Sequence, residues 1–279
     1  MNFAAQYLQQ LEAFAAGSPV PRIRALHLPP EPDRRDNLGE FCALELDDGS
    51  IGQSYVLFDD TLQRLSAGTV GLDLQGRDPL ALAQHYARST GPWQTLGFAA
   101  ANALTQCLFS RAGFAPDASI DSIGNMQPLE GEHIGMIGLF KPLLGAVLRS
   151  GARLTVVELE ADLAGDAEGY RVTLDATELA DCDKVISTST LLLNDTLDRM
   201  LQSCPQSRWF GMVGPSAGCL PDALFTRGVT LLGGSAVSDR AGFVDALKAG
   251  TSRSAFTRKF SLTPDNYPGF EMLLARVTV

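Results

Sequence analysis

The sequence predicts an α/β protein in which a smaller α+β domain, residues 1–122, precedes a domain built on a parallel sheet, residues 123–279. Three observations predict it. In the first part, helix signals surround β-rich stretches and a hairpin signal. In the second part, apolar strand-like segments alternate with helix-like segments, which is typical of a parallel sheet covered on both faces. Between them, "ASIDSIGNMQPLEGE" is rich in loop residues and predicts the linker.

The first part is predicted to begin with a helix, an extended stretch and a hairpin. In "NFAAQYLQQLEAFAAG", residues 2–17, apolar side chains fall at helical spacing and Gly17 can end the helix. "PRIRALHL", residues 21–28, is predicted to be extended. "FCALELDDGSIGQSYVLF" has two β-rich stretches that meet at Asp48-Gly49, which is typical of a hairpin.

Two helices are predicted to complete the first part. Over residues 78–89, Asp78 can cap the helix and Pro79 suits its first position. The stretch "GPWQTLGFAAANALTQCLFSR", residues 91–111, is long and mostly apolar. A helix without a clear polar face is predicted to be buried on most sides.

The second part is predicted to alternate strands and helices. The strands are expected at 133–138, 153–158, 184–188, 208–213 and 229–233, with a short extended piece at 170–174. The helices are expected at 141–150, 190–203, 219–227 and 239–249. The last segment, "NYPGFEMLLARVTV", ends in an alternating pattern that predicts an edge strand.

Composition and charge restrict the class of protein. A chain of 279 residues with 45% apolar and 19% charged residues is typical of a globular protein with one or two domains. The net charge of −10 argues against binding to nucleic acid or to an anionic membrane. No signal peptide and no membrane-spanning apolar run is visible, and the five cysteines are scattered. The sequence therefore predicts a cytoplasmic protein.

The loop after the first predicted sheet strand is a candidate ligand site, because open parallel sheets bind ligands beyond the carboxyl ends of their strands. The loop "GMIGLFKP" carries Gly135, Gly138 and Phe140, and Lys141 stands at the expected start of the next helix, where an anion is favoured. The second strand ends at Glu158, an acid that would bond a ribose hydroxyl in a dinucleotide-binding protein. The glycine spacing differs from Gly-x-Gly-x-x-Gly, which disfavours a standard dinucleotide site.

Later strand ends share glycine and small polar or hydroxyl-bearing residues. They are Thr188, Thr190 and Asn194 after the third core strand, Gly214, Pro215 and Ser216 after the fourth, and Gly233, Gly234 and Ser235 after the fifth. Each set alone also suits helix caps and turns. Together with the first loop, they predict a cleft in which backbone and hydroxyl groups approach a ligand.

Familiar catalytic patterns are missing. His27 and His85 have no evident acidic partner in sequence, and His133 stands just before the first sheet strand; all three are predicted to be structural. No His-Glu-x-x-His or Gly-x-Ser-x-Gly motif is present. The cysteines are predicted to be buried, and Cys219, after the Gly-Pro-Ser turn, is the one thiol considered for ligand contact.

The stretches "IGMIGLFKPLLGAVLRSGARLTVVELE", "DKVISTSTLLLNDTLDRML", "GMVGPSAGCLPDALFTRGVTLLGGSAVSD" and "LGFAAANAL" resemble the heavy-metal chelation family, over roughly residues 30 to 260. The resemblance implies an enolase-N-terminal-like domain followed by a Rossmann-like domain, and a role in metal handling or corrinoid synthesis. It adds Asn102, which is expected to reach across to the sheet ends. A histidine is frequent in the family where this chain has Leu139, which weakens a metal assignment.

Two functions remain open from the sequence. The first is a protein that binds a small ligand, a transition-metal ion or a metal chelate, as an accessory to metal or metal-cofactor metabolism. A chelate or oxyanion is physically easier than a bare ion, because the strand ends offer few metal donors. The alternative is an enzyme, a transferase or lyase, with a nucleotide-like cofactor on the Gly135–Gly138 loop, its ribose at Glu158 and a phosphate at Lys141. Association with a partner enzyme and a homodimer are further hypotheses.

Overall fold

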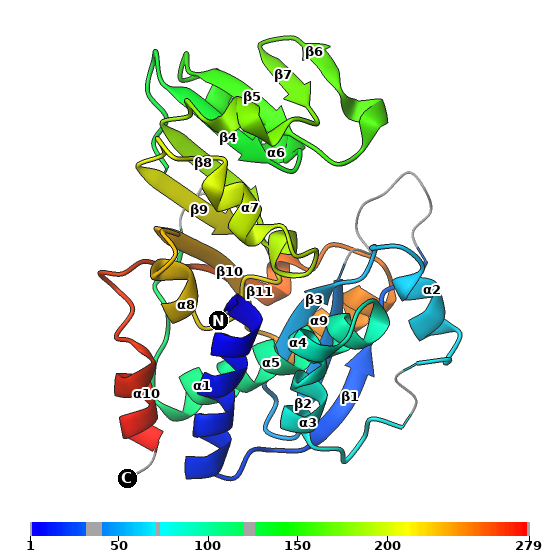
Figure 1. Cartoon of the computed structure of the whole chain (residues 1–279). Coiled ribbons are helices and arrows are strands. Elements are labelled where there is room, and N and C mark those ends of the chain that lie inside the picture. Colours follow the sequence, from blue (N-terminus) through cyan, green and yellow to red (C-terminus); the bar gives the residue numbers. More distant parts are fainter. Residues whose placement is uncertain (1, 32–40, 71–72, 120–125, 278–279) are drawn as a thin grey trace.

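The computed structural model describes residues 2–31, 41–70, 73–119 and 126–277. It contains a three-stranded antiparallel sheet and an eight-stranded, mostly parallel sheet (Figure 1). This confirms the predicted α/β class with a smaller sheet unit. In the described ranges, none of the helices combines the length and the apolarity that crossing a membrane requires.

The small sheet is formed by β1 (Ile23–His27), β2 (Phe41–Leu46) and β3 (Ile51–Tyr55), in the order β1-β2-β3. The predicted hairpin turns at Gly49, whose φ of 89° suits glycine. The helices of this unit are α1 (Phe3–Gly17), α2 (Thr61–Ser66), α3 (Pro79–Ala83), α4 (His85–Arg88) and α5 (Pro92–Arg111). The helix predicted over 78–89 is therefore two short helices, and α2 was not predicted.

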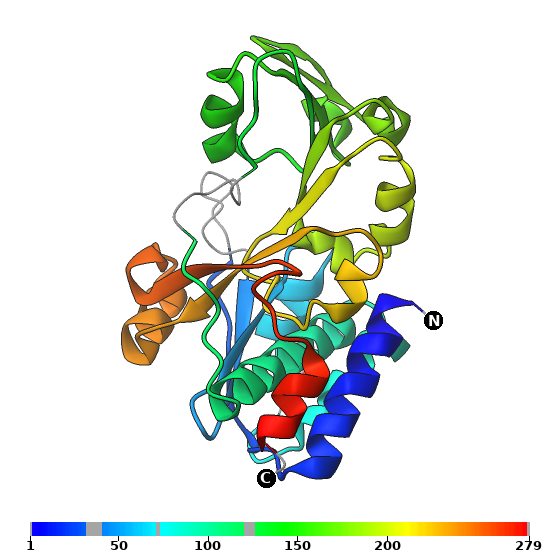
Figure 2. The ribbon, with the colours of Figure 1, turned by 90° about the vertical axis from the view of Figure 1, so that its left-hand side faces the viewer.

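Helix α5 is the centre of this unit and is buried along most of its length, as its apolar sequence predicts. It packs against one face of the small sheet, and α1 and α10 lie beside it (Figure 2). The side chains that α1 buries are Phe3, Tyr7, Leu8, Leu11 and Phe14. Their helical spacing is the pattern from which α1 was predicted.

The large sheet has the order β11-β10-β9-β8-β4-β5-β7-β6. Its strands are β4 (His133–Ile137), β5 (Arg153–Val157), β6 (Gly165–Ala167), β7 (Tyr170–Thr173), β8 (Lys184–Thr188), β9 (Trp209–Val213), β10 (Leu231–Val237) and β11 (Thr257–Leu262). The outer strands β6 and β11 are antiparallel to their neighbours. Numbered along the chain, the six parallel strands follow the order 3-2-1-4-5-6, which is that of dinucleotide-binding sheets.

Helices cover both faces of the large sheet. They are α6 (Lys141–Leu148), α7 (Leu197–Gln202) and α8 (Asp222–Phe225), with 3-10 turns η2 (Ala161–Leu163), η3 (Ala176–Leu179) and η4 (Ser189–Leu192). Helix α9 (Arg240–Lys248) and the 3-10 turn η5 (Ser254–Phe256) pack with the small sheet instead. On one face, Ile134 and Met136 of β4 pack in a cluster with Val147 of α6. On the other, Ile137 joins the main core, which also contains Met200 of α7.

The predicted C-terminal edge strand is wrong. The segment forms helix α10 (Phe270–Val277), and the edge strand is β11, where no strand was predicted. Phe270, Leu273, Leu274 and Val277 stand at helical spacing and pack into or against the main core. Burial of this face overrides the short alternation at the end of the sequence.

Strand β10 links the two sheets. It runs to Val237 rather than ending at residue 233 as predicted, and it leads into α9. Phe243 and Leu247 of α9 pack against Ala43 and Ile51 of the small sheet. The small sheet therefore lies between α5 and α9, and the strand that continues into α9 also borders the candidate site.

Candidate functional site

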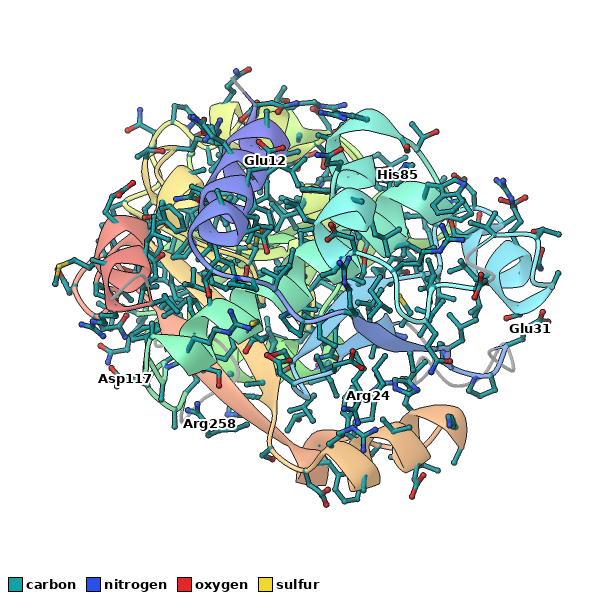
Figure 3. The ribbon with its side chains drawn as sticks, turned by 90° about the horizontal axis from the view of Figure 1, so that it is seen from below. Glu12, Arg24, Glu31, His85, Asp117 and Arg258 are labelled. Atoms are coloured by element: carbon teal, nitrogen blue, oxygen red, sulfur yellow. The ribbon has the colours of Figure 1, made fainter. Side chains whose placement is uncertain are left out.

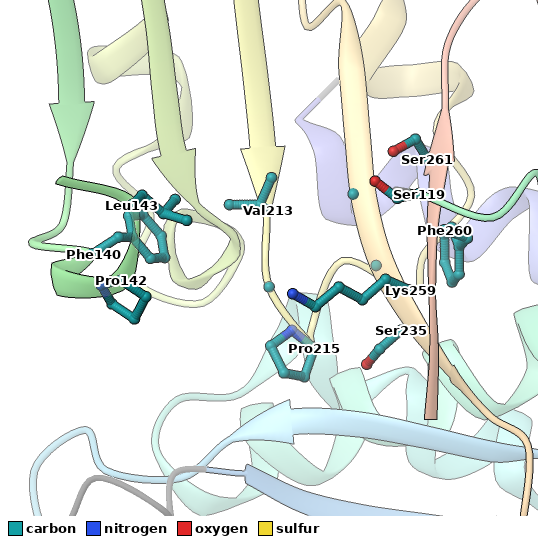
Figure 4. Close-up of a pocket in the computed structure, with 13 residues that line it drawn as sticks. Ser119, Phe140, Pro142, Leu143, Val213, Pro215, Ser235, Lys259, Phe260 and Ser261 are labelled. Atoms are coloured by element: carbon teal, nitrogen blue, oxygen red, sulfur yellow. The ribbon is translucent and has the colours of Figure 1, made fainter. Parts of the chain in front are cut away.

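A cavity of about 260 Å³ lies at the carboxyl end of β9 and beside the middle of β10, between the start of α6 and strand β11 (Figure 4). Its lining residues are Ser119, Phe140, Pro142, Leu143, Val213, Gly214, Pro215, Gly233, Gly234, Ser235, Lys259, Phe260 and Ser261. Six residues predicted from the sequence are among them: Phe140, Gly214, Pro215, Gly233, Gly234 and Ser235. This edge of the sheet is where open α/β sheets bind ligands.

The two sides of the cavity differ in chemistry. Phe140, Pro142 and Leu143 form an apolar wall at the start of α6, and Val213 and Pro215 continue it (Figure 4). The opposite wall comes from β10 and β11 and carries hydroxyls and an ammonium group: Ser235, Lys259 and Ser261. A ligand in this cavity meets apolar surface on one side and polar groups on the other.

Glycines allow the cavity wall to form. A Cβ atom at Gly234 would lie 2.4 Å from Cζ of Phe260 and 2.6 Å from the carbonyl oxygen of Ala217, so a side chain there would displace β11 or the preceding loop. Gly214 has a φ of 144°, and a Cβ atom there would lie 2.4 Å from Oγ of Ser189. Gly233 and Gly234 lie within β10 and not at its end, which corrects the predicted strand boundary.

Two hydroxyls on the polar wall have different environments. Ser235 Oγ accepts a hydrogen bond of 3.2 Å from Nε2 of Gln53, so the small sheet contacts the cavity wall directly. Ser261 is 7% exposed, and its Oγ has no hydrogen-bond partner among the described residues. Buried hydroxyls are normally paired, so an unpaired one beside a cavity is available to a ligand.

The predicted residues at the ends of β4 and β8 form a second group, outside the cavity lining. Gly138 has a φ of 85°, and its N–H donates to the carbonyl of Val157 (2.9 Å). Thr188 Oγ1 accepts hydrogen bonds from the N–H and the hydroxyl of Thr190, at 3.2 and 3.1 Å. Asn194 Oδ1 likewise accepts from the N–H and hydroxyl of Thr196. These polar atoms cap the local turns.

Glu158 and Gly135 do not have the environments that a nucleotide site would need. The Glu158 carboxylate accepts hydrogen bonds from the N–H groups of Leu139 and Leu159, so it closes the first loop. Gly135 was predicted to lie in that loop, but it lies in the middle of β4. A Cβ atom there would lie 2.8 Å from Cδ2 of Leu179, so this glycine allows the η3 turn to pack on the sheet.

Lys141 begins α6 as predicted, but its side chain is exposed and lies outside the cavity lining. The cation of the cavity is Lys259 on β11. It was missed because the strand was missed. The signal was present in "TRKFSL", where Lys259 and Ser261 alternate with the apolar residues Phe260 and Leu262.

Asn102 reaches across from α5 to the sheet ends, as expected. Its Nδ2 donates to the carbonyl oxygens of Gln53 (2.9 Å) and Ser216 (3.1 Å), and its Oδ1 accepts from the Tyr7 hydroxyl (3.1 Å). Asn102 is 1% exposed. It therefore fastens the loop after β9 to the small sheet, behind the cavity wall. Ser216 is likewise buried and outside the lining.

We expect Asn102→Ala to lower the free energy of unfolding by about 2–3 kcal/mol, because two buried carbonyls lose their donor. Urea unfolding followed by circular dichroism would measure it. The matched control is Gln106→Ala, one turn along α5, where a half-buried amide bonds the carbonyl of Gly218 at 3.3 Å. We expect the control to cost about 1 kcal/mol or less. Equal losses in the two variants would contradict the proposed role of Asn102.

The histidines and cysteines have structural environments. His133 contacts Thr155 and Arg153, and His85 bonds Ser89. His27, for which no acidic partner was evident in sequence, has its Nε2 2.9 Å from Oε2 of Glu45. All five cysteines are buried and free. Burial raises the pKa of the Cys219 thiol to about 12, which leaves it unreactive near neutral pH.

Metal donors are scarce around the cavity. Within the described ranges, no three or more side chains of His, Cys, Asp and Glu are grouped so that they could hold a metal ion. The lining residues themselves include none of these four types among the described part of the chain. The donor set therefore does not fit a bare transition-metal ion.

Comparisons with solved structures give the same fold. A protein of unknown function from the DUF364 family of Desulfitobacterium hafniense DCB-2 is 20% identical, with a TM-score of 0.67, over 94% of this chain and 100% of that chain. Another DUF364 protein of unknown function, from Pyrococcus horikoshii, is 20% identical, with a TM-score of 0.68, over 92% of this chain and 99% of that chain. At this identity the likeness concerns the fold.

Sequence comparisons identify the family. An uncharacterized protein of Methanocaldococcus jannaschii is 28% identical over 153 residues, which are 52% of this chain and 55% of that protein. The match thus spans about half the length of this curated relative. The DUF364 family model, described as "Putative heavy-metal chelation", matches residues 121–264, just over half of the 279 residues. The chain therefore belongs to the DUF364 family.

Proposed function

We propose that this protein binds a small ligand or metal chelate in the cavity beside β9 and β10, as an accessory to metal or metal-cofactor metabolism. The observation that carries the proposal is the cavity itself, which lies at the expected edge of a parallel sheet and has an apolar wall facing hydroxyls and a lysine. The family description adds the link to metals.

A metal would be bound in this cavity as a chelate. The lining residues that the structure describes offer hydroxyls, an ammonium group and backbone atoms, and none of the thiolate, imidazole or carboxylate ligands that transition metals prefer. A chelate brings its own donors to the metal. The protein then needs only to recognise the organic shell, for which apolar contact and a few hydrogen bonds are sufficient.

The alternative function, a transferase or lyase with a nucleotide-like cofactor on the Gly135–Gly138 loop, is favoured by the 3-2-1-4-5-6 strand order. Two observations weigh against it. The Glu158 carboxylate is already bonded to the loop, and Gly135 serves packing within β4. Measuring whether NAD, ATP or S-adenosylmethionine stabilises the protein against thermal unfolding tests this alternative directly.

The proposal is tested by blocking the cavity. Thermal unfolding of the protein would be measured with nickel, cobalt and zinc salts, with their citrate and picolinate chelates, and with the three nucleotide cofactors. A ligand at 100 times its dissociation constant adds about 2.7 kcal/mol to the free energy of unfolding. Val213→Trp places an indole in the cavity, and we expect it to abolish the stabilisation by the active compound.

The control variant is Leu174→Trp, which adds an indole at an exposed position, beyond the end of β7 and outside the cavity lining. We expect it to keep the stabilisation. A panel in which no compound stabilises the wild-type protein would contradict ligand binding. Stabilisation that survives Val213→Trp would place the binding site elsewhere.

A further inference from the structure

We propose that the ligand of this cavity is an organic anion with a compact apolar body, bound with its acid group against the wall formed by Ser261 and Lys259. This inference rests on the proposed function, because it names the ligand class of the same cavity. The cavity would then recognise the organic anion itself. Such an anion can bind whether or not it carries the metal that the family description mentions.

The distribution of charge favours an anion. The protein carries 32 acidic residues and a net charge of −10, yet among the described lining residues there is no Asp or Glu and the charged side chain is Lys259. Lys259 also takes part in a contact within the chain. Its positive charge nevertheless makes the electrostatic potential at this wall more positive. A cationic ligand would lose its hydration in this cavity, and no carboxylate among the described lining residues would offset that cost.

The unpaired hydroxyl of Ser261 points to a hydrogen-bonding group on the ligand. Leaving a buried hydroxyl unpaired is unfavourable, and the Ser261 side chain is directed into the cavity from β11 (Figure 4). Its O–H can donate to a carboxylate oxygen, which is the stronger acceptor because it is charged. Lys259 is two residues away on the same strand, so both side chains project to the same face of β11.

The apolar wall of the cavity indicates the chemical character of the part of the ligand that lies away from the acid group. The rings of Phe140, Pro142 and Pro215 face the polar wall across the cavity (Figure 4). They offer flat surfaces without hydrogen-bonding groups. A volume of about 260 Å³ accommodates one small ring with a short substituent. An aromatic or alicyclic carboxylate combines both features.

Three probes of nearly equal shape and different charge test the inference: benzoate, benzamide and benzylammonium. Isothermal titration of the full-length wild-type protein at pH 7 would measure the affinity for each. We expect benzoate to bind about tenfold more tightly than benzamide, since a charged acceptor strengthens the hydrogen bond. Benzylammonium is expected to bind most weakly.

Ser261→Ala locates the acid group. Because the hydroxyl has no partner among the described residues, its removal should leave the thermal midpoint unchanged or slightly raised, while benzoate affinity falls roughly fivefold to tenfold. The matched control is Ser54→Ala on β3, another buried serine without a partner in the described chain, which lies outside the cavity lining. It should leave benzoate affinity unchanged.

The outcomes separate the two proposals. Benzamide or benzylammonium binding as tightly as benzoate would overturn the inference, as would equal benzoate affinity in Ser261→Ala and wild type. If none of the three binds while a compound of the chelate panel does, the inference fails and the proposed function stands. If nothing in either set binds, both fail.

Discussion

Replacing Gly52 with alanine is expected to prevent the chain from reaching its native fold. A Cβ atom at this position of β3 would lie 2.1 Å from the backbone nitrogen of Ala103, 2.2 Å from the carbonyl oxygen of Ala99 and 2.7 Å from the carbonyl carbon of Asn102. These atoms belong to the backbone of α5, so no side-chain rotation relieves the contact. The strand and the helix would have to separate.

The cost of this separation is large because α5 packs directly on the small sheet. Overpacking that side chains can absorb costs about 1–3 kcal/mol. Here the shift must also disturb Asn102, whose bond to Gln53 crosses the same interface. Because domains are stable by only about 5–15 kcal/mol, Gly52→Ala should be insoluble or lack a cooperative transition.

The control for Gly52→Ala is Gly218→Ala. A Cβ atom at Gly218 would also approach α5, at 3.7 Å from Nε2 of Gln106 and 3.9 Å from Cβ of Asn102, which are ordinary contacts. We expect its free energy of unfolding to stay within about 0.5 kcal/mol of wild type. Soluble yield and urea unfolding would compare the two. A Gly52→Ala protein with the wild-type urea midpoint would show that α5 and β3 can move apart freely.

The elements that the sequence predicts well are those specified by local signals. Helix α1 follows from apolar spacing, the hairpin from Asp48-Gly49, and β8 from a short apolar run, and each lies where it was expected. Of the residues predicted after β9 and in β10, Gly214, Pro215, Gly233, Gly234 and Ser235 line the cavity and Ser216 does not. They were predicted because parallel strands bring their carboxyl ends to one edge.

The missed features depend on contacts between distant segments. Strand β11 is an edge strand, and Lys259 reaches the cavity only because β11 pairs with β10. The hydrogen bond between Gln53 and Ser235 joins residues 182 positions apart, and no local sequence pattern at either residue predicts it. Gly135 was assigned to a loop because glycine signals a turn, whereas here it allows Leu179 to pack on β4.

Glu45→Gln is expected to lower the free energy of unfolding by about 3 kcal/mol, because a buried carboxylate loses its charge-assisted hydrogen bonds while its arginine partners are half exposed. The side chain of Glu45 on β2 is fully buried. Its carboxylate bonds Nε2 of His27 at 2.9 Å and Nε of Arg240, and Nε of Arg24 lies 3.4 Å away. Figure 3 shows Arg24 between the small sheet and α9. The amide keeps the shape of the acid and removes its charge.

The loss in Glu45→Gln should depend on pH in a defined direction. Burial raises the pKa of the Glu45 carboxyl, but hydrogen bonds from Arg240 and His27 outweigh it and hold the pKa below its usual value. The ion pair therefore stabilises the fold fully above the ordinary glutamate pKa, about 4.3. It is lost as the pH falls through the lowered pKa of the folded state. The difference between wild type and Glu45→Gln should be fully present near neutral pH and shrink as the pH drops below about 4.

Urea unfolding at a series of pH values measures this difference, with Asp60→Asn as the control. Asp60 pairs with Arg64 at 3.7 Å on the surface, and such an exposed pair contributes about 0–1 kcal/mol.

Arg240 begins α9, which directly follows the strand of Gly234 and Ser235. Glu45→Gln should therefore also weaken ligand binding in the cavity, although Glu45 does not line it. A pH-independent loss would show that the charge of Glu45 contributes nothing, and intact binding in the variant would show that α9 and the cavity wall are uncoupled.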